Sequence, residues 1–344
     1  VDEPLAICSV KRFIGDYALR DEYNVPLVEP RPATGKRISV IGAGPSGLTC
    51  AYYLANMGHE VHVYESESVA GGVLYWGIPE YRLPKAVLQK EIHAIERSGV
   101  QIHLNTRIGS DITFEDMKKQ SDAVYIASGT QVSRLLDVPG EDLKGVESGL
   151  GFLKRIGLKK DMSVPNKLVV IGGGSTAMDV ARTVIRKGSH HVTLYARGSH
   201  SDASLHETQY AMLDGAKFEF SSNIVEINDN GPVFQQILYD EEGNVTGYSG
   251  EKEQVYADSV IISISQGPKS KLVNTTEGLK ATRNGLLQTD EQGETTVEGI
   301  FASGDVVLGA KTVVEAVAYS KTVADAMDAY MKEKAGKEKN QKDG

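Results

Sequence analysis

The stretch Arg37-Ile-Ser-Val-Ile-Gly-Ala-Gly-Pro-Ser-Gly47 decides the fold of this 344-residue chain. Five residues with the pattern of a buried strand run directly into a glycine-rich turn, and a helical pattern follows. Gly42 makes the turn, Gly44 lets the backbone approach a pyrophosphate, and Gly47 lets the helix pack on the strand. The free N–H groups at the start of the helix favour a phosphate. The stretch therefore predicts a dinucleotide-binding βαβ unit.

An acidic residue completes this first pattern. A second strand is predicted over residues 61–65, and its last residue, Glu65, lies 23 positions (65 − 42) after Gly42. A carboxylate at this spacing accepts hydrogen bonds from the ribose hydroxyls of an adenosine. The alternative is a chance glycine turn followed by an exposed glutamate. Strand, helix and acid together favour the dinucleotide interpretation.

The same plan recurs downstream and ends in a cation. A strand over residues 167–171, the turn Gly172-Gly-Gly174-Ser-Thr-Ala177, a helix over 178–187 and a strand over 191–195 repeat the first unit after 130 residues (172 − 42). Alanine is allowed at the last glycine position. Arg197 follows the second strand, where a cation suits a 2′-phosphate and so favours NADP(H) over NAD(H). The alternative is an ordinary surface arginine.

These two sites, one with an acid and one with a cation, imply FAD together with NAD(P)H. Hydride transfer from nicotinamide C4 to flavin N5 is carried by the cofactors, so no catalytic side chain is required. The remaining pattern predicts a helix over residues 6–17, short strands between residues 217 and 265 with turns at Gly243 and Gly247, and a last helix over 312–331. The charged stretch 332–344 is predicted to be a frayed, solvated end.

Composition excludes several classes of function. With 37 basic and 46 acidic residues the net charge is −9, which makes nucleic acid and anionic membranes poor partners. No apolar run approaches the ~18 residues of a membrane span. Two cysteines, Cys8 and Cys50, indicate a reducing, cytoplasmic compartment, and we expect both to be packed residues. Because the histidines are scattered, we predict no metal site, with His59 and His62 at turns or on the surface.

The chain resembles the small (beta) subunit of NADPH-dependent glutamate synthase and the related flavoprotein segments of dihydropyrimidine dehydrogenase and electron-bifurcating transhydrogenases. The resemblance covers about residues 2–331 and rests on a set of specific motifs. Residues 71–84, Gly-Gly-Val-Leu-Tyr-Trp-Gly-Ile-Pro-Glu-Tyr-Arg-Leu-Pro, are similar to the flavin-edge signature of the family. The other matching stretches are residues 2–13, 41–48, 127–130, 299–305 and 312–316.

The resemblance implies an α/β fold of two doubly wound, Rossmann-like domains, with the NAD(P) domain inserted in the FAD domain. The expected boundaries are an N-terminal helix and arm over 1–35, an FAD-binding domain over 36–155 plus 284–331, an NAD(P)H-binding domain over 156–283, and a charged tail over 332–344.

The motifs and the resemblance together give the expected cofactor contacts. Trp76, Gly77, Ile78 and Pro79 are candidates for the flavin edge, where Trp76 either stacks on the flavin or only packs. The predicted FAD-binding residues are Gly42, Gly44, Pro45, Ser46, Gly47, Glu65, Gly72, Arg82, Ala127, Ser128, Gly129, Thr130, Gly304, Asp305, Thr312, Val313 and Ala316. The predicted NAD(P)-binding residues are Gly172, Gly174, Ser175, Thr176, Ala177, Arg197, Gln266 and Gly267.

The resemblance also implies what the chain does. It describes a module that moves hydride between NAD(P)H and FAD and relays single electrons to or from iron–sulfur clusters of partner subunits, in an electron-bifurcating transhydrogenase-type or glutamate synthase-type complex. The chain lacks the family's N-terminal cysteines, so such clusters are expected only in partners or in an upstream segment. Because Ala196 stands where the family has an arginine, an NADH-specific module is one alternative. A non-catalytic nucleotide-binding subunit and a stand-alone oxidase are others.

Overall fold

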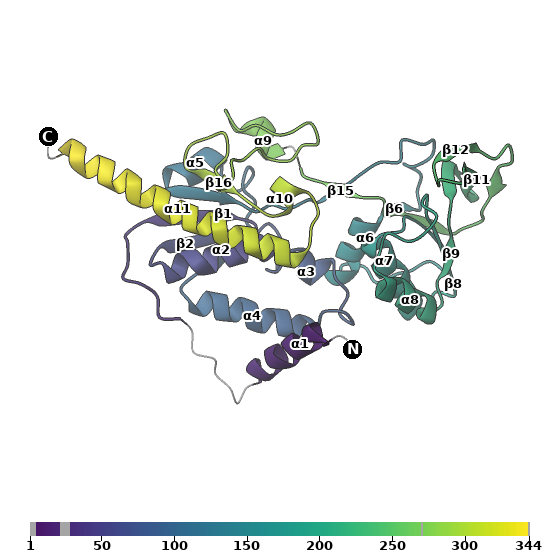
Figure 1. Cartoon of the computed structure of the whole chain (residues 1–344), viewed down its shortest axis with the longest axis horizontal. Helices are drawn as coiled ribbons and strands as arrows, with labels where there is room; N and C mark the ends of the chain where they lie inside the picture. Colours follow the sequence, from purple (N-terminus) through teal and green to yellow (C-terminus); the bar gives the residue numbers. More distant parts are fainter. Residues whose placement is uncertain (1–4, 21–27, 270, 343–344) are drawn as a thin grey trace. The chain divides into compact units, whose positions relative to one another are not determined.

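A computed structural model describes residues 5–20, 28–269 and 271–342, which divide into two compact units (Figure 1). Unit 1 takes the described residues of Val1–Tyr75, Leu83–Gly129 and Ser270–Gly344, and unit 2 takes Trp76–Arg82 and Thr130–Lys269. Within the described ranges, no helix is both long and apolar enough to cross a lipid bilayer.

Unit 1 is built on a parallel sheet of five strands. In spatial order these are β16 (Ile300–Ala302), β4 (Ala123–Ile126), β1 (Arg37–Ile41), β2 (Glu60–Tyr64) and β3 (Gln101–His103). The strand order reverses between β1 and β4, and in doubly wound sheets ligands bind outside the carboxyl ends of the strands at such a point. The strand predicted over residues 37–41 is confirmed with the same limits.

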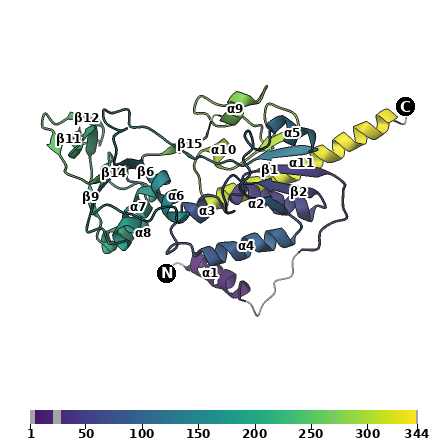
Figure 2. The ribbon, with the colours of Figure 1, turned by 180° about the vertical axis from the view of Figure 1, so that it is seen from behind.

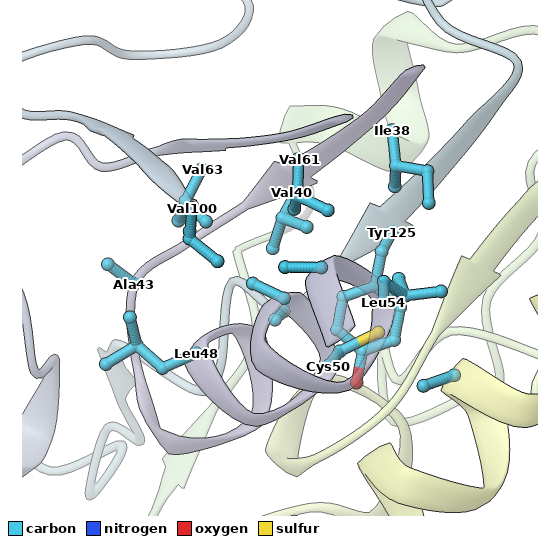
Figure 3. Close-up of a cluster of buried hydrophobic side chains, with 14 of the residues drawn as sticks. Ile38, Val40, Ala43, Leu48, Cys50, Leu54, Val61, Val63, Val100 and Tyr125 are labelled. Atoms are coloured by element: carbon cyan, nitrogen blue, oxygen red, sulfur yellow. The ribbon is translucent and has the colours of Figure 1, made fainter. Parts of the chain in front are cut away.

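Helices cover both faces of this sheet. The helices of unit 1 are α1 (Ile7–Ala18), α2 (Pro45–Asn56), α4 (Lys85–Arg97), α5 (Phe114–Lys119), α9 (Lys271–Thr275), α10 (Asp305–Leu308) and α11 (Val313–Lys342), and α3 (Val73–Trp76) runs from unit 1 into unit 2. Helices α2 and α11 lie side by side (Figures 1 and 2). Figure 3 shows the cluster that fixes α2, in which Val40, Val61 and Val63 of the strands lie over Leu48 and Leu54 of the helix.

Unit 2 repeats this plan with a different edge strand. Its parallel sheet has the order β6 (Val146–Ser148), β14 (Ser259–Ile262), β7 (Lys167–Ile171), β8 (His191–Tyr195) and β9 (Lys217–Glu219), and its helices are α6 (Gly149–Gly157), α7 (Ser175–Arg186) and α8 (Leu205–Asp214). An antiparallel sheet of β10 (Ser222–Asn228), β11 (Gly231–Tyr239), β12 (Val245–Tyr248) and β13 (Glu253–Gln254) follows, and β5 (Val132–Ser133) pairs with β15 (Gln266–Gly267).

Unit 2 includes the edge strand β6, which lies before the start of the NAD(P)H-binding domain expected over residues 156–283. Val146 and Ser148 pair in parallel register with Val260 and Ile262 of β14, so the segment before residue 156 belongs to the second sheet. At the other end, the unit stops at Lys269 instead of residue 283. A three-residue edge strand carries too little pattern to be assigned to a sheet from sequence.

Three local expectations are wrong. Gly247 lies inside β12, opposite Leu238, whereas Gly243 is the turn residue with a φ of +83°. Helix α11 continues to Lys342 because the predicted tail is rich in residues that favour helix and forms ion pairs four residues apart, such as Lys337 to Glu333 at 2.7 Å. Cys8 is exposed on α1, whereas Cys50 is buried as expected.

His59 and His62 are both buried: His59 directly follows a turn, one of the two positions expected for it, whereas His62 lies inside β2, contrary to expectation. His59 connects three segments: its Nδ1 lies 2.7 Å from Thr34 Oγ1, and its Nε2 lies 3.0 Å from Asp328 Oδ1 of α11. Lys332 donates to the other oxygen of Asp328 at 2.6 Å. Burial of Asp328 opposes its ionisation, but the hydrogen bonds from Lys332 and His59 outweigh this and hold the pKa of the carboxyl below its ordinary value.

We expect Asp328→Asn to destabilise the chain at neutral pH by about 1–3 kcal/mol, because it weakens the partner of a buried imidazole. A lowered folded-state pKa gives stability that is present above the ordinary carboxyl pKa of ~3.9 and is lost as the pH falls through the folded value. The difference in Tm between the two proteins should therefore shrink in acid. Thermal denaturation at several pH values checks this, with Asp325→Asn, at an exposed site on the same helix, as the control. A difference that persists unchanged below the folded pKa would contradict it.

Candidate functional site

The first glycine turn requires glycine at two positions for reasons internal to the protein. Gly42 has a φ of +103°, and a Cβ added there would lie 2.5 Å from the carbonyl oxygen of Ala127. A Cβ added to Gly47 would lie 1.9 Å from the carbonyl oxygen of Gly42. These contacts let α2 start directly against the end of β1, which places the start of the helix at the carboxyl edge of the sheet.

At position 44, in contrast, no contact within the protein requires glycine. Its φ of −80° suits any residue, and a Cβ there would meet no described atom within 4 Å. No side chain among the described residues caps α2, whereas Thr113, Ser148 and Ser204 cap α5, α6 and α8. An open space beside uncapped helix N–H groups fits the pyrophosphate of a dinucleotide.

Glu65 lies where the ribose of that dinucleotide is expected. The residue follows β2 directly and is buried, with 7% of its surface exposed. Its Oε2 accepts a hydrogen bond from the backbone N–H of Ala43 at 2.9 Å, and its Oε1 accepts one from the N–H of Glu67 at 2.9 Å. The turn itself thus orients the carboxylate at the edge of the sheet, and this acceptor fits the ribose hydroxyls in the adenosine half of FAD.

The structure brings several predicted FAD residues of unit 1 together around this turn. A Cβ on Gly72 would lie 2.9 Å from Gly44 Cα, and one on Gly304 would lie 2.8 Å from Ser46 Cβ. Pro45 begins α2, and Asp305 begins α10 directly after Gly304. Ala127, Ser128 and Gly129 follow β4 at the carboxyl edge of the same sheet.

The predicted start of the last helix is also in place. Thr312 and Glu315 form a reciprocal cap, in which Glu315 N–H donates to Thr312 Oγ1 at 3.3 Å and Thr312 N–H donates to Glu315 Oε2 at 3.0 Å. Thr312 and Val313 are exposed, and Ala316 is buried. The cap occupies the first turn of α11 with protein groups, and the flavin contact of these residues stays a prediction.

The predicted flavin-edge residues belong to unit 2. Trp76 is buried beneath α6: Lys154 Nζ lies 5.0 Å from the centre of its ring, and a Cβ on Gly157 would lie 2.3 Å from its carbonyl oxygen. These contacts favour the packing alternative for the indole. Gly77 is buried, and Ile78 and Pro79 are half-buried.

Arg82 and Thr130 have contrasting surroundings in unit 2. Arg82 Nη1 contacts both oxygens of Asp179 at 2.7 Å, and its Nη2 contacts Glu207 at 2.8 Å. Two carboxylates thus hold the guanidinium, and its contact with FAD stays a prediction. Thr130 is 2% exposed, and its Oγ1 is buried without a hydrogen-bond partner among the described atoms.

The second glycine turn shows the same division of roles as the first. Gly172 has a φ of +139°, and a Cβ there would lie 2.3 Å from the carbonyl oxygen of Ser263. Gly174 has no described atom within 4 Å of an added Cβ, and α7 starts after it without a side-chain cap from the described residues. Ala177 is fully buried against the sheet, while Ser175 Oγ donates to Glu207 at 3.1 Å. Thr176 is half-buried beside it.

Arg197 is exposed and is the second residue after β8, whereas Glu65 directly follows β2, so Ala196 holds the position that corresponds to Glu65. Its Nη2 donates to the hydroxyl of Tyr248 at 3.3 Å, which holds the guanidinium near the end of the strand. Ala196 is buried. Gln266 and Gly267 form β15, paired with Ser133 and Val132 of β5. The second site thus offers a cation two residues beyond its strand, whereas the first offers a carboxylate directly after its strand.

Sequence reasoning missed one group of residues. Tyr125, Ser303 and Ser320 are buried and surround the hydroxyl of Ser46, which therefore faces the protein interior. These positions lie on separate elements far apart in the chain, so no local pattern could have linked them.

Known proteins are similar to this chain both in sequence and in fold. The model of the family described as pyridine nucleotide-disulphide oxidoreductase matches residues 36–320. The chain is 35% identical to the NADP(+)-dependent formate dehydrogenase subunit beta of Moorella thermoacetica over 97% of this chain and 52% of that protein. It is 30% identical to the glutamate synthase [NADPH] small chain of Escherichia coli (strain K12) over 94% of this chain and 74% of that protein.

The structure of Mycobacterium tuberculosis FprA in complex with NADPH has the same fold, with a TM-score of 0.74 and 19% identity over 90% of this chain and 86% of that one. The chain spans about half the length of the first curated relatives that it matches.

We expect Gly44→Ala and Gly47→Ala to separate cofactor binding from folding. Gly44→Ala should leave the Tm of the apoprotein unchanged and weaken FAD binding by about tenfold or more, since the methyl group occupies the space of a phosphate. Gly47→Ala should destabilise the apoprotein by about 1–3 kcal/mol through overpacking. Thermal denaturation and FAD titration of both variants check this. If Gly44→Ala binds FAD as tightly as the parent, the pyrophosphate does not bind at this turn.

Proposed function

The chain belongs to the pyridine nucleotide-disulphide oxidoreductase family, and from this membership we propose that it connects NADPH with one-electron carriers through FAD. It is a flavin-dependent NAD(P)H oxidoreductase module. Bound FAD would supply the chemistry, because flavin accepts a hydride and can release its two electrons one at a time. The chain's own residues bind and orient the two dinucleotides.

A single observation carries the proposal: the chain has two glycine turns whose middle glycine has open space where a side chain would lie, one turn near a carboxylate and the other near a cation. The buried Glu65 suits a ribose with free hydroxyls, as in the adenosine of FAD. The exposed Arg197 suits a 2′-phosphate, as in NADPH. The two units therefore select different nucleotides with the same fold.

The relatives support a partner that carries single electrons. Besides the two already described, a further relative is named as an NADPH-Fe(3+) oxidoreductase subunit beta. We propose that the chain likewise works with iron–sulfur and flavin-containing subunits of a cytoplasmic complex. An electron-bifurcating transhydrogenase-type or a glutamate synthase-type reaction fits this role. An NADH-specific version of the module is the alternative, because Ala196 removes a second cation from the site.

Disulphide chemistry is not part of the proposal. A reactive cysteine must ionise and be accessible. Cys50 is fully buried in the core of unit 1, its Sγ lies 3.9 Å from Met327 Sδ, and burial raises the pKa of its thiol well above the ordinary value. Cys8 is exposed on α1 and is not paired with Cys50.

We expect anaerobic NADPH to bleach the visible absorbance of the FAD-loaded chain at a much lower concentration than NADH. Arg197→Ala should raise the NADPH concentration needed for half-bleaching by about ten- to a hundredfold, the worth of a charge-assisted contact, and leave the NADH value unchanged. Arg283→Ala removes an exposed arginine of unit 1 and is the matched control.

The outcomes distinguish the alternatives. A preference of the parent chain for NADH would make the module NADH-specific. If Arg197→Ala raises the concentration needed for half-bleaching equally for NADPH and NADH, Arg197 does not bind the 2′-phosphate. No bleaching by either nucleotide would overturn the redox role and leave a nucleotide-binding subunit. Steady NADPH consumption in air without a partner would favour an oxidase.

A further inference from the structure

Four hydroxyl groups meet in the interior of unit 1. The oxygens of Ser46, Tyr125, Ser303 and Ser320 are mutual neighbours: Ser46 Oγ lies 2.8 Å from the Tyr125 hydroxyl, 3.0 Å from Ser303 Oγ and 2.9 Å from Ser320 Oγ. Ser320 Oγ lies 3.0 Å from the Tyr125 hydroxyl and 2.9 Å from Ser303 Oγ, and Tyr125 also contacts Ser303. We call these four residues the hydroxyl cluster.

The hydroxyl cluster is sealed from water. Tyr125 and Ser320 have no exposed surface, Ser303 is 1% exposed and Ser46 is 7% exposed. Four hydroxyls hold only four protons, and Ser320 Oγ donates to the carbonyl oxygen of Ala316 at 2.6 Å. The remaining protons must be shared among more close contacts than they can satisfy. Removing one oxygen therefore forces the other hydroxyls to reorient, so the arrangement of the cluster depends on each of its four members.

Each member comes from a different element that leads to the predicted FAD site. Ser46 is the second residue of α2, next to the open Gly44. Ser303 follows β16 and precedes Gly304 and Asp305. Ser320 lies one turn beyond Ala316 in α11. Tyr125 belongs to β4, which leads to Ala127, and its hydroxyl contacts all three serines.

The approach of Gly304 to Ser46 shows how directly these elements are coupled. A Cβ on Gly304 would lie 2.8 Å from Ser46 Cβ and 3.0 Å from Ser46 Oγ. The backbone that leads to Asp305 therefore lies on the first turn of α2. A change in the direction of the Ser46 side chain would displace either the loop of Asp305 or the N–H groups at the start of α2.

We propose that the hydroxyl cluster positions the FAD-binding segments of unit 1, with Tyr125 as the positioning residue that fixes the start of α2, the loop of Asp305 and the first turns of α11 in one arrangement. This inference rests on the proposed binding of FAD to unit 1. Tyr125 acts through Ser46, Ser303 and Ser320 and is not placed in contact with the cofactor.

The experiment compares FAD binding by Tyr125→Phe and Ser320→Ala with that by Ser39→Ala. Each variant removes one buried hydroxyl, and the control is matched because Ser39 is 1% exposed on β1 of the same sheet, with its Oγ 2.7 Å from Ser121 Oγ. Ser121 precedes β4, so this pair is linked to the amino ends of the strands. The readouts are the Tm of the apoprotein, the Kd of FAD from quenching of its fluorescence, and the visible circular dichroism of bound FAD.

We expect all three variants to lose similar apoprotein stability, and only Tyr125→Phe and Ser320→Ala to raise the Kd of FAD, by about three- to tenfold, and to change the dichroism of the bound flavin. The double variant should raise the Kd by less than the product of the two single effects, because both residues act through one network.

A Kd and a dichroism spectrum equal to those of Ser39→Ala, with a lowered Tm, would show that the hydroxyl cluster only stabilises the fold and would overturn the proposal. If Tyr125→Phe does not fold, Ser320→Ala, which is a smaller change, is compared with Ser39→Ala in its place. Failure of the parent chain to bind FAD would instead contradict the proposed function, so the two failures are distinguishable.

Discussion

The passage of β1 into α2 through Gly42 and Gly47 is the constraint on which unit 1 depends. The carbonyl of Gly42 occupies the place that a side chain at position 47 would need, and the carbonyl of Ala127 occupies the place of one at position 42. Helix α2 can therefore start against the sheet, with its N–H groups at the carboxyl edge between β1 and β4. The core below the helix and the open space at Gly44 both follow from this close approach.

Unit 2 meets the same constraint with other residues, and we propose that it binds a different nucleotide. Gly172 lies against Ser263 as Gly42 lies against Ala127, and Gly174 is open as Gly44 is. The difference lies just beyond the second strand: Glu65, a buried carboxylate, directly follows β2, whereas β8 is followed by the buried Ala196 and then by the exposed guanidinium of Arg197. In the proposed function, backbone geometry recognises the pyrophosphate in both units, and the charge near the strand end selects between the nucleotides.

The interior of unit 1 carries polar groups as well as apolar ones. The hydroxyl cluster around Tyr125 and the link from Thr34 through His59 to Asp328 both tie α11 to the sheet, although the two contacts involve opposite ends of the strands. Because buried hydrogen bonds are directional, they fix the arrangement of the elements more narrowly than packing alone. This explains how a helix late in the chain is held in place beside the segments that begin at residue 42.

The sequence by itself determined both glycine turns, the strands at residues 37–41, 167–171 and 191–195, and the contrast between Glu65 and Arg197, because these features arise from contiguous residues with a fixed local period. Only the tertiary structure decided that β6 joins the second sheet, that Arg82 lies between Asp179 and Glu207, and that the Ser46 hydroxyl faces Tyr125. Those contacts join residues far apart in the chain. Packing and burial determine which residues meet, and a local sequence pattern does not predict this.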